Sequence, residues 1–131
     1  MGLTYSKIIL SNPRRTDLGT VELTSLVDTG ALTLCIPQHI ADRLELEELD
    51  KRLVVIADGT SRLVPYVGPI RIDVGNRFCF TGALILGNET LLGAIPMEEL
   101  DVIVHPSTQR LMPNPLHPNK PGYTIKCSSL G

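Results

Sequence analysis

The alternation of apolar and polar positions along the chain predicts a protein built mainly from short β-strands. Runs rich in β-branched and apolar residues, bounded by Gly, Pro, Asn or Asp, are typical of strands. Two tight-turn signals, Asp58-Gly59 and Gly75-Asn76, lie between neighbouring runs and predict hairpins. The runs cover Lys7–Leu10, Thr20–Val27, Leu53–Ala57, Leu63–Val67, and residues 70–74 and 78–86.

Two short segments have a helical pattern instead. Ile40 and Leu44 recur at helical spacing after Pro37, a residue that suits the first turn of a helix. A second short helix is predicted over residues 94–100, directly after Leu91-Leu92-Gly93. Beyond it we expect a hairpin over 101–112, an extended Pro-rich segment over 113–121 and a last strand over 123–126.

Composition restricts the architecture further. The chain has 131 residues, which is the size of one domain, and its apolar fraction of 43% is enough for a core. Ten Pro and eleven Gly imply many turns and argue against a helical bundle. We therefore expect one mainly β domain over residues 1–131, a small closed β-barrel-like lobe with one or two short helices.

Charge and cysteine usage exclude several classes of partner. The net charge of −2 provides no electrostatic footprint for nucleic acid or an anionic membrane. Three Cys without a CxxC motif fit a reducing compartment, and without a signal peptide or a long apolar span the expected location is the cytoplasm. The three His are scattered, so neither a metal site nor a cofactor is expected.

One carboxylate stands out against its surroundings. In the segment SLVDTGALTLCIP, residues 25–37, Asp28 follows an apolar run and is followed by another. Carboxylates seldom occupy such positions unless they are paired or used. On its own, Asp28-Thr29-Gly30 is a weak signal, because an Asp turn with Gly30 at positive φ is the more common explanation of the tripeptide.

Two further segments of the sequence favour a functional role for Asp28 over a simple turn. A hairpin signal, Ile56-Ala57-Asp58-Gly59-Thr60, follows the Asp-Thr-Gly-Ala segment, and Leu91-Leu92-Gly93 then precedes a short helix. In this order the three pieces resemble the retropepsin-like aspartic proteases, a family of viral and single-domain cellular enzymes, and most closely its bacterial and cellular branch. The resemblance covers about residues 21–111.

The resemblance implies an acid-protease lobe that works as a two-fold homodimer. Hydrolysis by water needs a base and an acid, and two adjacent carboxylates that share one proton supply both. Because the chain has a single Asp-Thr-Gly, the second Asp28 has to come from a second copy. In this reading the catalytic loop is Asp28, Thr29 and Gly30, and an extended peptide is bound by Ala31, Ala57, Asp58, Gly59 and Thr60.

Two functions follow from this resemblance. The first is an aspartic endopeptidase, and the second is a dimer of the same fold that binds peptides or serves as a scaffold with little turnover. An intact Asp28 favours the first, because a pure binder does not need a carboxylate there. Two features depart from the viral pattern: Ala94-Ile95 follows the late glycine in place of Arg-Asn or Arg-Asp, and the hairpin has one glycine. In the family terminal strands often build the dimer interface, and the tail over residues 113–131 is a candidate for that role.

Overall fold

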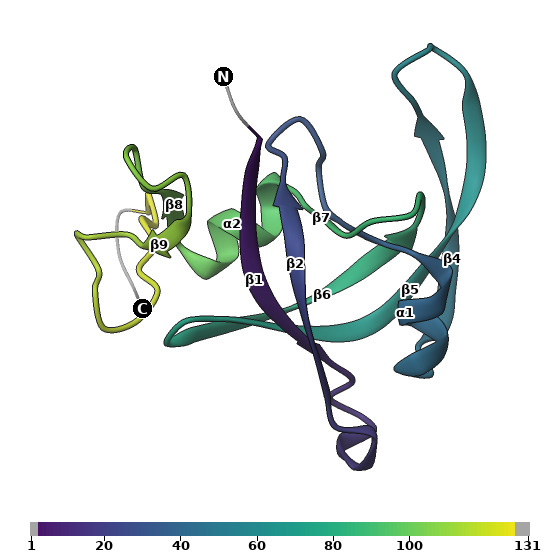
Figure 1. Cartoon of the computed structure of the whole chain (residues 1–131), viewed down its shortest axis with the longest axis horizontal. Helices are drawn as coiled ribbons and strands as arrows, with labels where there is room; N and C mark the ends of the chain where they lie inside the picture. Colours follow the sequence, from purple (N-terminus) through teal and green to yellow (C-terminus); the bar gives the residue numbers. More distant parts are fainter. Residues whose placement is uncertain (1–2, 128–131) are drawn as a thin grey trace.

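The computed structural model describes residues 3–127 and is mainly β (Figure 1). Two short α-helices and one 3-10 helix accompany the strands. The elements in chain order are β1 (Thr4–Ser11), η1 (Thr16–Leu18), β2 (Thr20–Val27), β3 (Leu34–Ile36), α1 (Gln38–Arg43), β4 (Glu47–Val55), β5 (Ser61–Val74), β6 (Arg77–Ile85), β7 (Leu91–Leu92), α2 (Ala94–Leu100), β8 (Val102–Val104) and β9 (Leu111–Pro113).

Seven strands form one mixed sheet in the order β1-β2-β7-β3-β6-β5-β4. Hairpins make the β1–β2, β4–β5 and β5–β6 pairs antiparallel, whereas β2 pairs with β7 and β3 with β6 in parallel. β1 also pairs with β5 over Ile9–Ser11, so the hydrogen-bonded neighbours form a circuit that returns to β1. β8 and β9 form a separate two-stranded sheet beside α2 (Figure 1).

The core lies inside this circuit and is lined by alternate residues of its strands. Burial alternates along β5, where Ile70, Ile72 and Val74 are buried and Arg71 and Asp73 are partly exposed. That period of two is the one expected for a sheet with one face toward the core. Fully buried side chains come from β1, β3, β5 and β7 and from the ends of the two α-helices, namely Ile8, Leu10, Leu34, Ile36, Leu44, Ile70, Ile72, Leu92 and Leu100.

Most of the predicted elements are found, and several are longer than predicted. β4 begins at Glu47, well before the predicted run Leu53–Ala57, and includes the acidic residues Glu47, Glu48 and Asp50. It pairs with β5 alone at the edge of the sheet, and its residues are almost all exposed. Pro65 in β5 lies opposite Lys51, just before the register with β6 starts at Tyr66, so its missing N–H interrupts no ladder with β6.

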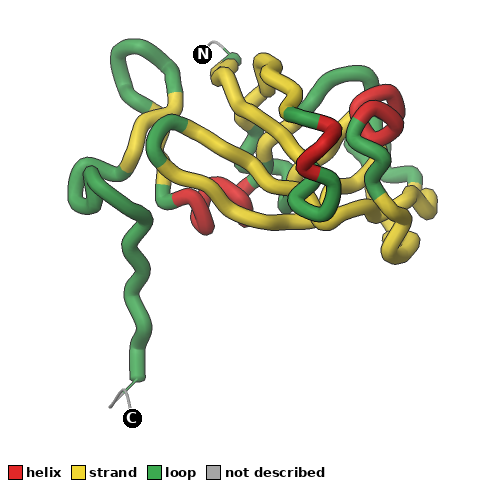
Figure 2. Tube along the Cα trace, turned by 90° about the horizontal axis from the view of Figure 1, so that it is seen from below, coloured by secondary structure: helices red, strands yellow, loops and turns green. Residues whose placement is uncertain are grey.

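One predicted element is absent from the described chain. Residues 123–126 form no strand and extend away from the body (Figure 2). A strand requires a neighbour that completes its hydrogen bonds, and no other strand of the described chain pairs with these residues.

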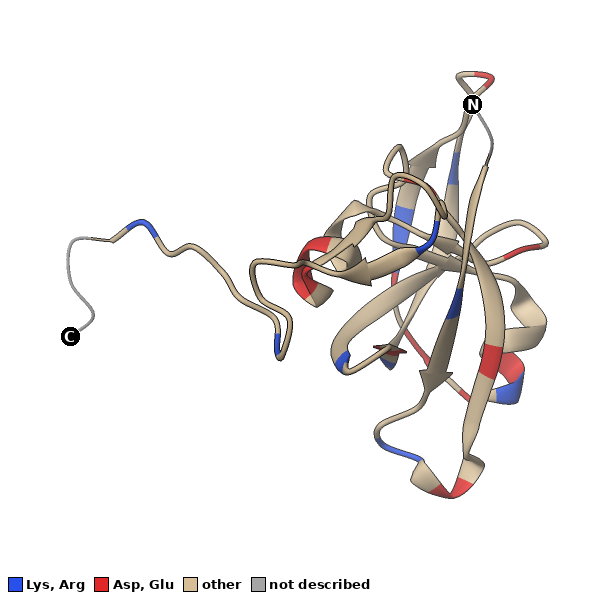
Figure 3. Cartoon of the chain, turned by 60° about the vertical axis from the view of Figure 1, so that its left-hand side comes forward, with Lys and Arg blue, Asp and Glu red and all other residues tan. Residues whose placement is uncertain are grey.

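Charged residues are spread over many elements rather than gathered on one (Figure 3). Most ion pairs are surface contacts, such as Lys7 with Glu22 at 2.8 Å across the β1–β2 ladder. Exposed pairs of this kind contribute little to stability. No helix within residues 3–127 is both long and apolar enough to span a membrane.

A buried arginine fixes the segment that follows β9. Arg77 is 3% exposed, and its guanidinium donates hydrogen bonds to the carbonyl oxygens of Leu100, Asp101 and His117 at 3.3, 3.0 and 2.7 Å. A buried guanidinium needs such acceptors because its desolvation is costly. The start of β6, the end of α2 and the 114–122 segment are thereby joined at one point.

The carboxylate of Asp101 completes this anchor. It accepts hydrogen bonds from Asn114 Nδ2 at 3.1 Å and the Gly122 N–H at 2.9 Å, and it lies 2.7 Å from His117 Nδ1. The Gly122 N–H and then the Asn114 amide are the main causes that lower the pKa of Asp101 from 3.8 to about 2. The anchor therefore favours the ionised carboxylate.

We predict that Asp101→Asn reduces stability at neutral pH and that this difference shrinks in acid. A depressed folded-state pKa contributes stability above the unfolded value of about 3.8, and this contribution is lost as the pH falls toward about 2. Urea unfolding of both proteins between about pH 7 and pH 2 measures the effect. Asp42→Asn, which changes an exposed helical carboxylate, serves as the control. A constant difference between wild type and Asp101→Asn across this range contradicts the assignment.

Candidate functional site

Asp28 begins the loop that directly follows β2. Its backbone N–H donates to the carbonyl of Leu92 at 3.0 Å, and its side-chain Oδ1 accepts from the Gly30 N–H at 2.9 Å. The turn closes through the Ala31 N–H, which donates to the Asp28 carbonyl at 3.1 Å. The carboxylate is therefore half-buried and oriented by its own loop, whereas the Thr29 side chain and Gly30 are exposed.

The loop is joined by backbone hydrogen bonds to the start of α2. The N–H groups of Ala94 and Ile95 donate to the carbonyls of Ala31 and Leu32, both at 2.9 Å. The first N–H groups of a helix have no partner within the helix, and here the loop supplies the acceptors for two of them. The parallel β2–β7 pair and α2 thus hold both ends of the Asp28 loop.

Gly93 is required by the close approach of these two segments. A Cβ atom at this position would lie 2.3 Å from the Thr33 carbonyl oxygen and 2.7 Å from the Ala31 carbonyl oxygen. Both neighbours are backbone atoms that are themselves held in the fold, so they have little freedom to move away. Leu92 and Gly93 therefore lie against the loop that begins at Asp28.

Two buried residues near the loop were not singled out from the sequence. Ser25 is fully buried in β2, and its hydroxyl donates to the Thr90 carbonyl at 3.1 Å, next to the Leu26 N–H bond to the same oxygen. Its only signal was a small polar residue inside an apolar run. Cys35 is buried in β3, where burial and then the charge of Asp28 raise the pKa of its thiol.

The other predicted site residues occupy the tip of the β4–β5 hairpin. Gly59 adopts φ of 87°, the left-handed conformation that the turn requires. Asp58 accepts hydrogen bonds from the Thr60 hydroxyl at 2.6 Å and the Thr60 N–H at 2.9 Å, and these two bonds lower its pKa. Ala57, Asp58, Gly59 and Thr60 are all exposed.

Within one chain the hairpin tip and the Asp28 loop remain separate. They project at the same end of the molecule (Figure 1), but no hydrogen bond or ion pair of the described residues joins them. The structure therefore brings Asp28, Thr29, Gly30 and Ala31 together with 92–95, and leaves residues 57–60 apart from them. Within residues 3–127 no cluster of three His, Cys, Asp or Glu is arranged to hold a metal ion.

Comparison with known proteins identifies the fold. No protein-family model matches the sequence, and no curated protein matches it. The structure is similar to the retroviral protease-like domain of Ddi1 from Leishmania major, with a TM-score of 0.57 and 11% identity over 88% of this chain and 90% of that one. Lower similarity is found to the simian foamy virus protease (TM-score 0.45, 16% identity, 70% of this chain and 90% of that one) and to a retropepsin-like aspartic protease from Rickettsia conorii (0.44, 18%, 80% and 88%). The chain therefore has a retropepsin-like fold, as the sequence resemblance predicted.

We predict that Gly93→Ala destabilises the protein by about 1–3 kcal/mol, the usual cost of forcing a methyl group into a packed site. The added Cβ has to displace the backbone of Thr33 and Ala31, so the Asp28 loop moves with it. Urea unfolding measures the loss. Asn88→Ala, in the exposed turn before β7, is the control and should unfold like wild type. An unchanged stability for Gly93→Ala contradicts this account of the loop.

Proposed function

We propose that the protein is an aspartic endopeptidase that acts as a two-fold homodimer. The observation that supports this most directly is the held carboxylate of Asp28, on an exposed Thr29-Gly30 loop, in a chain with a retropepsin-like fold. The circuit of strand pairings that returns from β5 to β1 fits the closed, barrel-like lobe expected for such an enzyme. The site is made of protein groups alone, without metal or cofactor.

Two observations indicate that a second copy of the chain is needed: the chemistry of hydrolysis and the apolar surface around the Asp28 loop. One carboxylate cannot serve as acid and base at once, and this chain supplies one Asp-Thr-Gly loop. Two large apolar side chains beside the loop are exposed, Leu32 at 69% and Ile95 at 49%. Covering them with a partner's surface is favourable because it removes apolar area from water. We place the two-fold axis beside Thr29, whose exposed hydroxyl is available to bond across it.

In this dimer the two Asp28 carboxylates lie close together and share one proton. Like charges at short distance make double ionisation costly, so one carboxylate is acid and its twin is base. The base takes a proton from water, which attacks the peptide carbonyl, and the acid gives its proton to the carbonyl oxygen. The tetrahedral intermediate then collapses: the carboxyl that took the water's proton gives it to the peptide nitrogen, the C–N bond breaks, and the hydroxyl proton returns to the other carboxylate. The Gly30 N–H bond to Asp28 Oδ1 fixes the direction of the carboxylate.

The β4–β5 hairpin supplies the other wall of the substrate site. An extended peptide lies between Ala31 and the tip residues Ala57, Asp58, Gly59 and Thr60, which close over it and exclude water. The exposed tip and its single left-handed glycine fit a segment that changes contacts when substrate binds. The Asp58–Thr60 hydrogen bonds keep the tip in one turn geometry as it moves.

Replacing Asp28 with Asn tests the proposal. We expect the variant to keep the fold and the dimer and to lose peptide hydrolysis by at least ~1000-fold, because Asn can neither accept nor deliver the proton. Cleavage of a denatured peptide library, with fragments identified by mass spectrometry, is the measurement. Asp42→Asn controls for the loss of a surface carboxylate and should cleave like wild type.

The same experiment separates the second function from the first. If neither wild type nor Asp28→Asn cleaves peptides, and both preparations are folded and dimeric, the result supports a module that binds peptides without cleaving them. In that case Asp28→Asn should bind peptide nearly as well as wild type. Equal cleavage by wild type and Asp28→Asn contradicts an aspartic mechanism outright.

We also predict a bell-shaped dependence of kcat/KM on pH with an optimum in the mildly acidic range. The active pair holds one proton, so activity falls in strong acid when both carboxylates are protonated and at higher pH when both are ionised. Rates on one identified peptide from about pH 3 to about pH 9 measure the profile. Activity that stays flat from about pH 4 to about pH 9 contradicts a carboxylate pair.

A further inference from the structure

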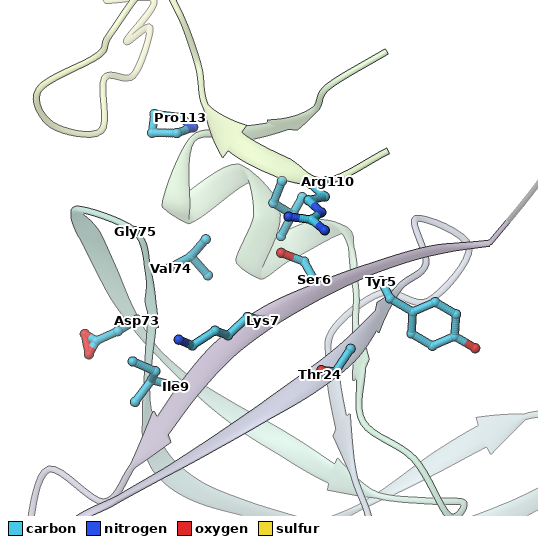
Figure 4. A pocket seen from close by; sticks show the side chains of 11 residues that line it. Tyr5, Ser6, Lys7, Ile9, Thr24, Asp73, Val74, Gly75, Arg110 and Pro113 are labelled. Carbon is cyan, nitrogen blue, oxygen red and sulfur yellow. The ribbon is translucent and has the colours of Figure 1, made fainter. Parts of the chain in front are cut away.

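A groove of about 710 Å³ lies between the large sheet and the two-stranded sheet (Figure 4). Ser6, Lys7 and Ile9 of β1 line one wall, and Arg110 and Leu111, at the start of β9, line the opposite wall. None of the residues assigned to the proposed peptidase lines this groove. Its contents therefore need an explanation of their own.

Each wall contains a strand with a free edge. β1 pairs with β2 along Thr4–Ser11, but with β5 only over Ile9–Ser11, so on that side Thr4–Ile8 have no strand partner within the described residues. β9 pairs with β8 alone in the same part of the chain. The backbone N–H and C=O groups of such edges are a template for an added strand. The groove between β1 and β9 thus fits an extended peptide.

The charges that line the groove are paired within the protein, with one exception. Lys7 Nζ lies 2.8 Å from the Glu22 carboxylate, and the Asp73 carboxylate lies 2.9 Å from the Arg71 guanidinium. The guanidinium of Arg110 has no hydrogen bond or ion pair within residues 3–127. One positive charge in the groove is therefore left without a counter-charge from its own chain.

A second donor lies beside this charge. The Arg110 side chain points toward Ser6 (Figure 4), and the Ser6 hydroxyl also has no hydrogen bond to any residue that the structure describes. A carboxylate can accept hydrogen bonds from both groups, and a guanidinium binds it through two parallel bonds. The charge and the donors of the groove are thus complementary to an acidic side chain.

The remaining surface of the groove is largely apolar. Ile9, Val74, Leu111 and Pro113 contribute to its lining, and Val74 is buried. Successive side chains of an extended peptide point to opposite faces, so one set can cover this surface while the other stays in water. Covering apolar area in this way is favourable.

We propose that this groove is a docking site for an extended segment of another protein that carries an acidic side chain. The segment adds as a strand to the Thr4–Ile8 edge, and its carboxylate binds Arg110 and Ser6. Its apolar side chains cover Val74 and Leu111. The site is separate from the proposed peptidase centre and depends neither on hydrolysis nor on a second copy of the chain.

Binding of short peptides tests the charge preference. The probes are three pools of fluorescein-labelled, capped hexapeptides in which Val and Thr alternate, with Glu, Gln or Lys at one inner position. They are titrated with Asp28→Asn protein, so that the proposed hydrolysis cannot consume them. By fluorescence anisotropy we expect the Glu pool to bind at least ~10-fold more tightly than the Gln pool, and the Lys pool to bind weakest. Equal affinity for the three pools, or no binding up to ~1 mM, overturns the proposal.

Reversing the charge of the groove distinguishes recognition from a loss of folding. We expect Arg110→Glu, in the Asp28→Asn protein, to weaken binding of the Glu pool at least ~10-fold and to strengthen binding of the Lys pool, which an unfolded protein cannot do. Arg43→Glu makes the same charge change at the exposed end of α1 and should alter both affinities less than ~3-fold. Unchanged affinities in Arg110→Glu overturn the proposal.

Amide chemical shifts of the ¹⁵N-labelled protein locate the bound peptide. With the Glu pool we expect the largest changes at Thr4–Ile8, Leu111 and Met112, and N-methylation of alternate peptide residues should abolish them by removing the donors that pair with a strand edge. Changes confined to Ala31 and residues 57–60 overturn the docking site and support the proposed peptidase site instead. Changes in the groove, together with no cleavage by wild type, support the docking site and contradict the peptidase alone.

Discussion

The backbone connection between the Asp28 loop, β7 and the start of α2 is the constraint on which the candidate site depends. Four main-chain hydrogen bonds, from Leu26 and Asp28 to residues 90 and 92 and from Ala94 and Ile95 to residues 31 and 32, hold the loop at both ends. They tie together segments that are more than sixty residues apart in the sequence. A carboxylate that is to work in a pair needs such rigidity, because a displacement of about 1 Å alters the interaction of two close charges strongly.

This connection is made by main-chain groups at the two positions where the sequence departs from the viral pattern. Where viral members often carry Arg-Asn or Arg-Asp after the late glycine, this chain has Ala94-Ile95, and their N–H groups alone bond the loop. The buried guanidinium of this protein comes from Arg77, at the start of β6, and it bonds to the carbonyl at the other end of α2. Helix α2 is thus attached by its first turn to the loop and by its last turn to the C-terminal anchor.

The local pattern of the sequence was sufficient for most elements. β2 has the predicted bounds Thr20–Val27, and both helices are where the sequence placed them. The catalytic roles assigned to Asp28, Thr29 and Gly30 stay predictions. What could not be predicted depends on contacts distant in sequence. The acidic stretch became a strand because β5 extends far enough to pair with it, and Arg77 is buried only because three distant carbonyls meet at its guanidinium. The strand predicted over residues 123–126 is the opposite case: the residues alternate as in a strand, but none of the strands within residues 3–127 pairs with them.

A single chain leaves several of its interactions incomplete, and they are of different kinds. The Asp28 loop has a half-buried carboxylate beside the exposed apolar side chains of Leu32 and Ile95, and one side of β1 has no strand partner over Thr4–Ile8 within the described residues. An isolated carboxylate, an unpaired strand edge and exposed apolar side chains each gain free energy from a complementary surface. In a two-fold dimer every such contact occurs twice, so modest contributions at the loop add to one association constant. If association forms the site, catalytic competence becomes a function of protomer concentration, because the monomer has neither a second carboxylate nor a second loop to oppose the first. The stability of the fold and the activity of the site can therefore vary independently, since the core of each lobe is complete within one chain.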